Sequence, residues 1–146
     1  MKIPSTYPLV ALLSLSPALA AKSKSTATFD TAYDNPSLSL STVTCSNGEH
    51  GLVTRKYKVI SDLPTRYVGG SPTVKAWNDP NCGACYALTY NHTKTVNVLA
   101  IDLAVGQFNV ALSALNELTG GNAQDFGRVD VQYELVNPRE CGMPAK

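Results

Sequence analysis

Apolar and polar residues alternate most strictly near the carboxyl end of the chain. Within residues 129–135 every second residue is apolar, with Asp, Gln and Glu between them. A period of two is typical of a strand that buries one face, so this stretch predicts a strand. Residues 86–90 and 95–101, rich in β-formers, predict two more strands joined by a tight connection. Residues 37–45, rich in Ser and Thr, predict a further strand.

One segment has the spacing of a helix. Leu112, Leu115 and Leu118 recur at helical intervals and form an apolar stripe. Asn109 has the side chain of an N-cap, and Gly120 suits the left-handed residue that ends a helix. Many short strands, one clear helix and turns rich in Gly and Pro together predict a mostly β barrel with a minor helical part.

The amino-terminal residues predict a targeting segment. Met1-Lys2 supplies a positive charge, residues 9–15 are an apolar run, and Ala18-Leu19-Ala20 has the small-x-small pattern of a cleavage site. The apolar run is far shorter than the roughly 20 residues that cross a bilayer, and no other stretch approaches that length. We therefore expect a signal peptide at residues 1–20 and a secreted protein that does not span a membrane.

The rest of the chain predicts a single domain. Residues 21–28 are small, polar and basic, which is typical of a flexible tail, and residues 29–146 contain no internal repeat and no linker. The formal net charge is +1, and loss of Lys2 with the signal peptide brings it near zero. A neutral surface argues against nucleic acid and anionic lipid as partners, because both require clustered Lys and Arg.

The cysteines indicate how the domain is stabilised. The chain holds four of them, Cys45, Cys82, Cys85 and Cys141. In an oxidising compartment an even number predicts disulfides, here two, and the sequence leaves all three pairings open. A redox motif at Cys82 and Cys85 is an alternative, but the residues after it favour a strand over the helix that such motifs open. A zinc site lacks a second short-spaced pair of ligands. We expect structural disulfides, with no metal and no cofactor.

Asp102 is the strongest candidate for a functional acid. It ends an apolar strand-like stretch, where a carboxylate is carried toward the mouth of a barrel. A glycosidase needs two carboxylates that flank one bond, and no partner for Asp102 can be assigned. The motifs of serine hydrolases, phosphate-binding loops and zinc proteases are absent from the sequence. Asp102 is therefore either a ligand contact or an acid that satisfies local backbone donors.

A modification motif lies in the predicted connection between the two central strands. Asn91, His92 and Thr93 form an N-glycosylation sequon. A tight connection between strands is exposed to solvent, which is what modification requires. We expect Asn91 to be an exposed glycosylation site.

Six short motifs are spread along the chain: CSNGEHGL (45–52), VGG (68–70), WNDPNCGAC (77–85), ID (101–102), GQFNV (106–110) and GRVD (127–130). They resemble those of the cerato-platanins, a family of small secreted fungal proteins. They occur in the family's order and cover nearly all of residues 29–141. Each is weak alone, and the combination is specific. The resemblance identifies residues 29–146 as a cerato-platanin domain.

The resemblance implies a particular fold. Cerato-platanins are similar to the barrel domain of expansins, so we expect a six-stranded double-psi β-barrel with one or two short helices. The resemblance also implies the pairing Cys45–Cys82 and Cys85–Cys141, which the residues alone leave open.

The resemblance also implies a function. Family members bind chitin-type oligosaccharides in a shallow groove, loosen polysaccharide networks without convincing hydrolysis, and in many cases act as plant-defence elicitors. Carried over by motif, Asp102 and Asn109 lie in the groove, with Arg128, Tyr33 and Asp34 as weaker contributors. Amide and carboxylate groups suit this role because they form hydrogen bonds with sugar hydroxyls.

We therefore expect a secreted, non-catalytic, expansin-like binder of N-acetylglucosamine oligomers that associates with the cell wall. Further expected partners are plant cell-surface receptors and, at interfaces, other copies of the chain. Two alternatives stay open: a weak endo-acting glycosidase that uses Asp102, and a surface-active, self-assembling protein. Trp77, close to Pro80 and a cysteine, is expected to pack in the core, which leaves Tyr33 as the more exposed ring.

Overall fold

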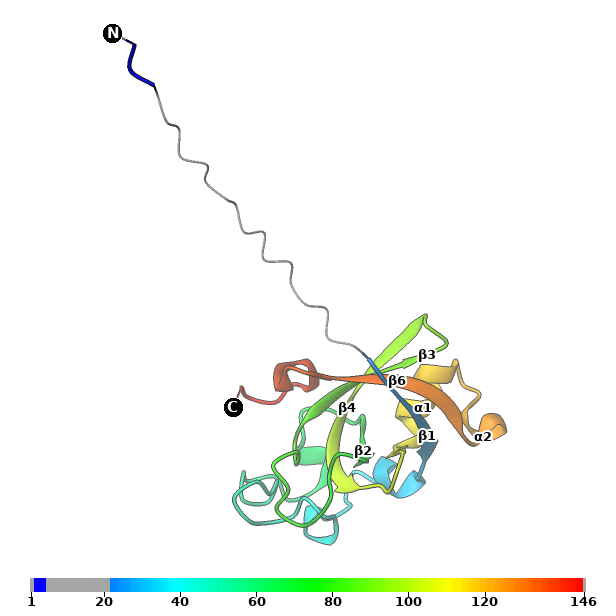
Figure 1. The fold of residues 1–146 in the computed structure, drawn as a ribbon. Helices are drawn as coiled ribbons and strands as arrows, with labels where there is room; N and C mark the ends of the chain where they lie inside the picture. Colours follow the sequence, from blue (N-terminus) through cyan, green and yellow to red (C-terminus); the bar gives the residue numbers. More distant parts are fainter. Residues whose placement is uncertain (1, 5–21, 146) are drawn as a thin grey trace.

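Six strands close into a barrel in the computed structural model, which describes residues 2–4 and 22–145 (Figure 1). Around the barrel they follow the order β1-β5-β2-β4-β3-β6, which confirms the predicted six-stranded architecture. The predicted signal peptide, residues 1–20, lies outside the described residues except for residues 2–4. The strand bounds are β1 Ser23–Phe29, β2 Val68–Ser71, β3 Cys85–Tyr90, β4 Lys94–Leu103, β5 Phe108–Val110 and β6 Val129–Val136.

Strand pairing in the barrel is mixed. β1 runs parallel to β5 and β2 parallel to β4, while the other neighbouring pairs are antiparallel. Parallel neighbours cannot be joined by a tight hairpin, so longer segments connect them. The 3-10 helices Thr31–Asp34, Leu40–Thr42 and Ile60–Asp62 lie between β1 and β2. The helices α1 Leu112–Thr119 and α2 Ala123–Phe126 lie between β5 and β6, and the 3-10 helix Pro138–Cys141 follows β6. None of the helices in the described ranges has the length and apolar character needed to cross a membrane.

Large side chains fill the barrel. Tyr86, Phe108 and Tyr133 meet edge to face, with ring centroids between 5.0 and 6.0 Å apart. Each such pair contributes about 0.5–1.5 kcal/mol beyond the burial of its area. Leu99 and Leu115 are fully buried around this cluster, the latter from α1. The packed interior leaves the outward-facing residues of the strands available for a binding site.

The strictest sequence patterns predicted the strands correctly. Residues 86–90, 95–101 and 129–135 lie in β3, β4 and β6. The strand predicted at residues 37–45 is wrong, because this stretch holds the Leu40–Thr42 3-10 helix and an isolated bridge at Ser39. The Ser and Thr hydroxyls here bind the local backbone, as when the Thr42 hydroxyl donates to the Ser39 carbonyl at 2.6 Å. Such local bonds compete with extended pairing.

The tail predicted at residues 21–28 is also wrong over the part that is described. Ser23–Phe29 forms β1, which pairs with β5 on one side and β6 on the other and so closes the barrel. Ala27 is the one residue of this strand that is fully buried. Phe29 also packs against the core but lies just beyond the predicted tail, so the part of β1 within the tail carries almost no hydrophobic signal in the sequence.

The start of α1 differs from the prediction, and its end agrees. Asn109 lies in β5 and does not cap the helix. The carboxylate of Asp34, distant in sequence, accepts hydrogen bonds from the backbone N–H groups of Leu112 at 2.7 Å and Ser113 at 3.0 Å. Gly120 follows the helix with a φ of 67°, as expected for a left-handed C-terminal residue.

Two disulfides tie loops to the barrel. Cys45 is bonded to Cys82 and Cys85 to Cys141, with Cα–Cα distances of 5.3 and 5.8 Å. This confirms the pairing that the family resemblance implied. The redox alternative for Cys82 and Cys85 is wrong, since each of these neighbours is bonded to a distant cysteine. The second bond attaches the Pro138–Cys141 segment to the start of β3.

Candidate functional site

The outer face of the barrel carries polar residues that lie side by side on successive strands. Gly70 on β2 is paired with Asp102 on β4 and, on its other side, with Asn109 on β5. Asn109 is paired in turn with Thr28 on β1. Because neighbouring strands lie about 4.8 Å apart, Asp102 and Asn109 stand about 10 Å apart on either side of Gly70.

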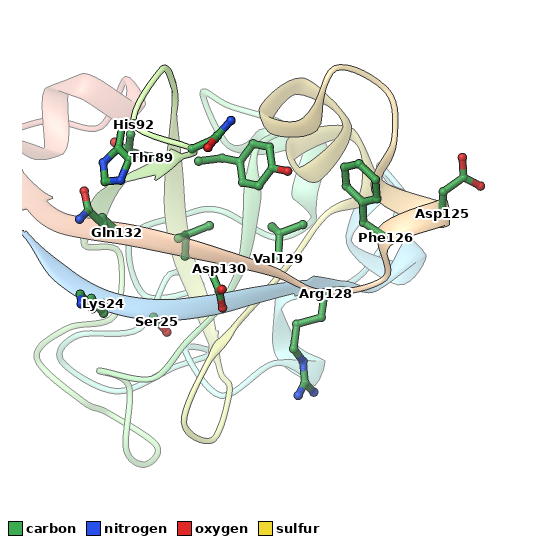
Figure 2. A pocket seen from close by; sticks show the side chains of 13 residues that line it. Lys24, Ser25, Thr89, His92, Asp125, Phe126, Arg128, Val129, Asp130 and Gln132 are labelled. Carbon is green, nitrogen blue, oxygen red and sulfur yellow. The ribbon is translucent and has the colours of Figure 1, made fainter.

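Arg128 continues this arrangement onto β6. Ala27 of β1 is paired with Val129 of β6 in antiparallel register, so Thr28, one residue after Ala27, lies beside Arg128, one residue before Val129. Figure 2 shows the Arg128 side chain on the same side of β6 as that of Asp130. The whole set crosses five strands and spans roughly 19 Å. We call it the polar row: Asp102, Gly70, Asn109, Thr28 and Arg128.

The polar row faces away from the core. On β5, Asn109 lies between the buried residues Phe108 and Val110, so strand alternation turns its side chain outward. Asn109 and Asp102 are half-buried and Arg128 is exposed. A ligand can therefore reach the row without any opening of the barrel.

Asp102 is held by four hydrogen bonds. Its Oδ1 atom accepts from the backbone N–H of Thr44 at 2.9 Å, the Thr44 hydroxyl at 2.7 Å and the backbone N–H of Leu103 at 2.9 Å. Among the described residues, Oδ2 accepts a single bond, from the Tyr33 hydroxyl at 2.9 Å. A carboxylate oxygen accepts about two hydrogen bonds. Oδ1 is therefore saturated, while Oδ2 keeps one acceptor position for a ligand hydroxyl.

Tyr33 supports Asp102 from the interior. Its side chain is only 7% exposed, so the prediction that it is the more exposed ring is wrong. The ring belongs to the core, and its hydroxyl reaches Asp102. Burial, and then the negative charge of Asp102, raise the pKa of the Tyr33 hydroxyl above its ordinary value. Tyr33 therefore stays protonated at neutral pH. Its hydroxyl donates a hydrogen bond that positions the Asp102 carboxylate.

Asp34 has a structural contact in place of a position in the row. Both of its carboxylate oxygens accept from the first backbone N–H groups of α1. These groups have no partner within the helix, so a carboxylate there stabilises the helix end. The family motifs group Asp34 with Tyr33 as groove residues; in the structure Asp34 contacts the start of α1 and Tyr33 contacts Asp102.

Asn109 and Arg128 supply the free donors of the polar row. The Asn109 Oδ1 atom accepts from the Thr28 hydroxyl at 3.0 Å. Within the part of the chain that the structure describes, the Asn109 amide nitrogen and the Arg128 guanidinium donate no side-chain hydrogen bond. Donors at one end and the Asp102 acceptor at the other match the mixed hydrogen-bonding capacity of sugar hydroxyl and N-acetyl groups.

Trp77 also differs from its prediction. It is 59% exposed and does not pack in the core. Its ring nitrogen donates to the Asn47 Oδ1 atom at 2.7 Å, which fixes one edge of the ring on the surface. No sequence motif marks Thr44 or Thr28 as a partner of Asp102 or Asn109, because these contacts join segments far apart in the chain.

A hollow of about 920 Å³ lies apart from most of the polar row, between the tip of the β3–β4 hairpin and α2 (Figure 2). His92 from the hairpin, Phe126 from α2 and Val131 from β6 are among the residues that line it. Of the polar row, Arg128 alone lies at its edge. Figure 2 shows the Phe126 and Arg128 side chains on opposite sides of β6, and the hollow also extends to Lys24, Ser25 and Asp130.

The closed six-stranded barrel and its two disulfides define a small double-psi β-barrel protein. The chain belongs to the cerato-platanin family, whose model matches residues 25–143. This confirms the family that the six sequence motifs indicated.

Individual relatives agree with this assignment. A heat-stable 19 kDa antigen of Coccidioides immitis is 47% identical over 116 residues, which cover 79% of this chain and 79% of the antigen. The crystal structure of cerato-platanin 3 from M. perniciosa has a TM-score of 0.80 at 37% identity, over 83% of this chain and 100% of that one. The solution structure of the fungal elicitor cerato-platanin has a TM-score of 0.71 at 33% identity, over 80% of this chain and 95% of that one.

A more distant likeness concerns the fold alone. The crystal structure of a mutant Clavibacter michiganensis expansin in complex with cellohexaose has a TM-score of 0.55 at 19% identity. The match covers 80% of this chain and 51% of the expansin. The barrel of this chain is thus shared with part of an expansin.

Proposed function

We propose that this chain is a secreted, non-hydrolytic cell-wall protein that binds chitin-type oligosaccharides along the polar row. The observation that carries the proposal is the row itself, a partly exposed line of donors and acceptors roughly 19 Å long. Membership of the cerato-platanin family supports it. An expansin of the same fold has been crystallised with cellohexaose, which supports an extended sugar chain as the ligand.

Each end of the row has a chemical role in this proposal. At one end, the open acceptor position of the Asp102 Oδ2 atom receives a sugar hydroxyl. In the middle, the Asn109 amide nitrogen donates to a hydroxyl or to the carbonyl of an N-acetyl group. At the other end, Arg128 donates to ring or hydroxyl oxygens. Gly70, between Asp102 and Asn109, is buried, and Ala104 and Leu103 fill the space beside it.

The environment of Asp102 argues against hydrolysis. All four contacts of its carboxyl group are donors, so the group is arranged to accept hydrogen bonds and no partner holds a proton on it for transfer to a leaving group. Glycosidases place two carboxylates about 5–9.5 Å apart. Asp130, on the same side of β6 as Arg128, lies four strands from Asp102, or roughly 19 Å. The weak glycosidase is therefore the less favoured alternative.

The proposal also places the protein outside the cell and in contact with a plant host. Two disulfides persist in oxidising compartments, which supports secretion. The name of a relative, the fungal elicitor cerato-platanin, supports defence elicitation through a plant cell-surface receptor. Cell-wall loosening follows if binding along the row competes with contacts between polysaccharide chains.

One observation favours surface activity as a second function. The end of β4 and the loop that follows it expose two apolar residues, Leu103 at 37% and Val105 at 85%. Such a tip favours self-association at an air–water interface, and Val105→Ser should slow film formation if this is so. Unchanged film formation in that variant would remove the support.

Titration with N-acetylglucosamine oligomers of increasing length tests the main proposal. Backbone amide shifts, measured by NMR on the disulfide-bonded protein, are expected to be largest along the polar row. They should strengthen until the oligomer covers the roughly 19 Å of the row. New reducing ends are measured in the same sample, and we expect none. Shifts that avoid the row, or oligomers that become shorter, would contradict the proposal.

Variants that spare the fold sharpen this test. Asn109→Ala removes one hydrogen bond and Arg128→Ala removes none that the described structure contains. Each should weaken binding about tenfold, which corresponds to roughly 1.4 kcal/mol, with little change in Tm. Asp125→Asn, on the exposed surface of α2, is the matched control. Undiminished affinity in both row variants would exclude the row as the site.

A further inference from the structure

We propose that Asn91 carries an N-linked glycan whose first sugars cover the hollow between the β3–β4 hairpin and α2. The inference rests on the geometry of the hairpin tip and on passage through the secretory pathway. It does not depend on what the polar row binds. The occupant of the hollow would thus be a modification of this chain.

The hairpin tip presents the sequon in a fixed conformation. Asn91 and His92 both have left-handed backbone angles, with φ of 52° and 58°. The backbone N–H of Thr93 donates to the Tyr90 carbonyl at 3.2 Å and closes the turn. Asn91 and His92 are thus the two central residues of a β-turn within a three-residue connection, since Tyr90 is paired with Lys94. Asn accepts the left-handed conformation more readily than most residues.

The sequon side chains are available for modification. Asn91, His92 and Thr93 are exposed, and in the described ranges neither the Asn91 amide nor the Thr93 hydroxyl makes a side-chain hydrogen bond. In the transfer, the Asn91 Nδ2 atom bonds to the anomeric carbon of an N-acetylglucosamine. The bond from that carbon to a lipid-linked diphosphate breaks, and the amide loses one proton. The donor is the lipid-linked oligosaccharide of the secretory pathway, and the folded turn leaves the product without a clash.

The hollow beside the tip offers a surface for the attached sugars. Asn91 itself lies on its edge. Phe126, opposite the hairpin, is 47% exposed, an unusual position for a phenylalanine in a chain that buries most of its large apolar residues. Half-buried Tyr90 and buried Val131 complete the apolar part of the lining, and polar residues such as Lys24 and Asp130 form the rest. Aromatic and aliphatic side chains of this kind pack against the apolar face of a pyranose ring.

The glycan would leave the polar row open. Arg128 belongs to the polar row and also lies at the edge of the hollow. Phe126 lies on the opposite side of β6 from Arg128 (Figure 2). Sugars attached at Asn91 and packed toward Phe126 therefore point away from Asp102 and Asn109. The modification shields an apolar surface without blocking the proposed ligand.

Expression of the full chain in a yeast secretory host tests the modification. We expect the intact mass of the secreted protein to fall on treatment with peptide-N-glycosidase F. The excess mass should be absent from Asn91→Gln and Thr93→Ala and present in Thr93→Ser, which keeps the sequon. Both disulfides are checked by mass in the same sample, since their presence shows that the chain passed through the oxidising compartment. A secreted, disulfide-bonded protein without the enzyme-sensitive mass would overturn the proposal.

A second measurement tests whether the sugars occupy the hollow. NOEs are expected between the N-acetyl methyl group of the first sugar and the Phe126 ring. Removal of the glycan should lower Tm by roughly 2 °C. This difference in Tm should vanish in Phe126→Ala. It should persist in the control Leu135→Ala, which alters an exposed apolar residue outside the hollow. A glycan without ring contacts and without a Phe126-dependent change in Tm would show that it leaves the hollow empty.

Discussion

Asp102 combines two roles that are often assigned to different residues. Its Oδ1 atom closes three hydrogen bonds from Thr44 and Leu103, while Oδ2 is oriented by Tyr33 and keeps an open acceptor position. The two readings that the sequence left open, structural acid and ligand contact, are therefore compatible. One consequence is practical: replacing Asp102 disturbs the fold and the site together, so its neighbours are the better probes.

Tyr33→Phe separates the two roles. The variant keeps the buried ring and removes the hydroxyl that donates to Asp102. Hydrogen bonds to charged groups contribute about 1.5–3 kcal/mol, so we expect unfolding by urea to show a loss of this size. Tyr57→Phe is the control, because the Tyr57 hydroxyl makes no hydrogen bond within the described residues. A loss no larger than that of the control would show that the Tyr33 hydroxyl does not stabilise Asp102.

The same residue predicts a loss of stability in alkali. Burial and the charge of Asp102 raise the pKa of folded Tyr33 above the value of about 10 that it has when unfolded. Stability is therefore complete below about pH 10, and above it the unfolded state loses its proton first. The free energy of unfolding then falls by about 1.4 kcal/mol per pH unit for this group. Burial also raises the pKa of Tyr86, so Tyr33→Phe should make the alkaline fall shallower without abolishing it. An equally steep fall in the variant would contradict this account.

The positions of single residues were predicted correctly where a family motif contains the residue. They were predicted wrongly where the question was whether a side chain is buried or exposed. The motifs put Asp102 and Asn109 in one site, and strand pairing does bring them to either side of Gly70. Tyr33 and Trp77 were exchanged: the tyrosine is buried and the tryptophan is exposed. Their burial depends on which loop folds over which face of the barrel, and neighbouring residues in the sequence do not encode this.

Among the elements, α1 depends on a contact from outside its own sequence. Its amino end is capped by Asp34, which lies in the 3-10 helix Thr31–Asp34 directly after β1. Local sequence pointed to Asn109 because N-caps normally come from the residue just before the helix. The long-range cap also joins the segment after β1 to α1, and so places Tyr33 beneath Asp102.

Asp34→Ala tests this cap. Loss of an N-cap costs about 0.5–2 kcal/mol, and because two N–H groups lose their acceptor we expect a value near the upper end. Asp34→Asn keeps one acceptor oxygen and should lose less. Urea unfolding followed by circular dichroism measures both variants. Equal losses in the two would indicate that charge near the helix end, more than hydrogen bonding, is what Asp34 supplies.

Whether a strand could be predicted from the sequence depended on how much apolar surface it buries. β3, β4 and β6 place Val, Leu or Tyr inward and were recognised from periodicity. β1 contributes Ala27 to the interior and was taken for a tail, although it closes the barrel. The closure is decided by backbone hydrogen bonds to β5 and β6, and these become favourable only once the other strands are in place.

At the scale of the whole molecule, the two disulfides hold different segments in place: one holds the loop at Thr44 and the other the carboxyl-terminal segment. Each closes a long loop, with sequence separations of 37 and 56 residues, and a loop of this size is worth about 4 kcal/mol in the chain-entropy model. Cys45 directly follows Thr44, whose backbone and hydroxyl hold Asp102, and the Cys45 N–H donates to the Ile101 carbonyl at 3.1 Å. The other bond anchors the carboxyl-terminal segment, which contributes nothing to the polar row.

The two paired deletions should therefore differ in their effect on binding. Cys45→Ala with Cys82→Ala is expected to lower Tm and also to weaken binding of N-acetylglucosamine oligomers, because the Thr44 loop no longer fixes Asp102. Cys85→Ala with Cys141→Ala is expected to lower Tm comparably and to leave affinity unchanged when measured well below the new Tm. Calorimetric titration of both variants beside the parent protein makes the comparison. Equal affinities in all three would mean that the loop holding Asp102 is positioned by packing alone, and that the barrel presents the polar row without help from its nearest disulfide.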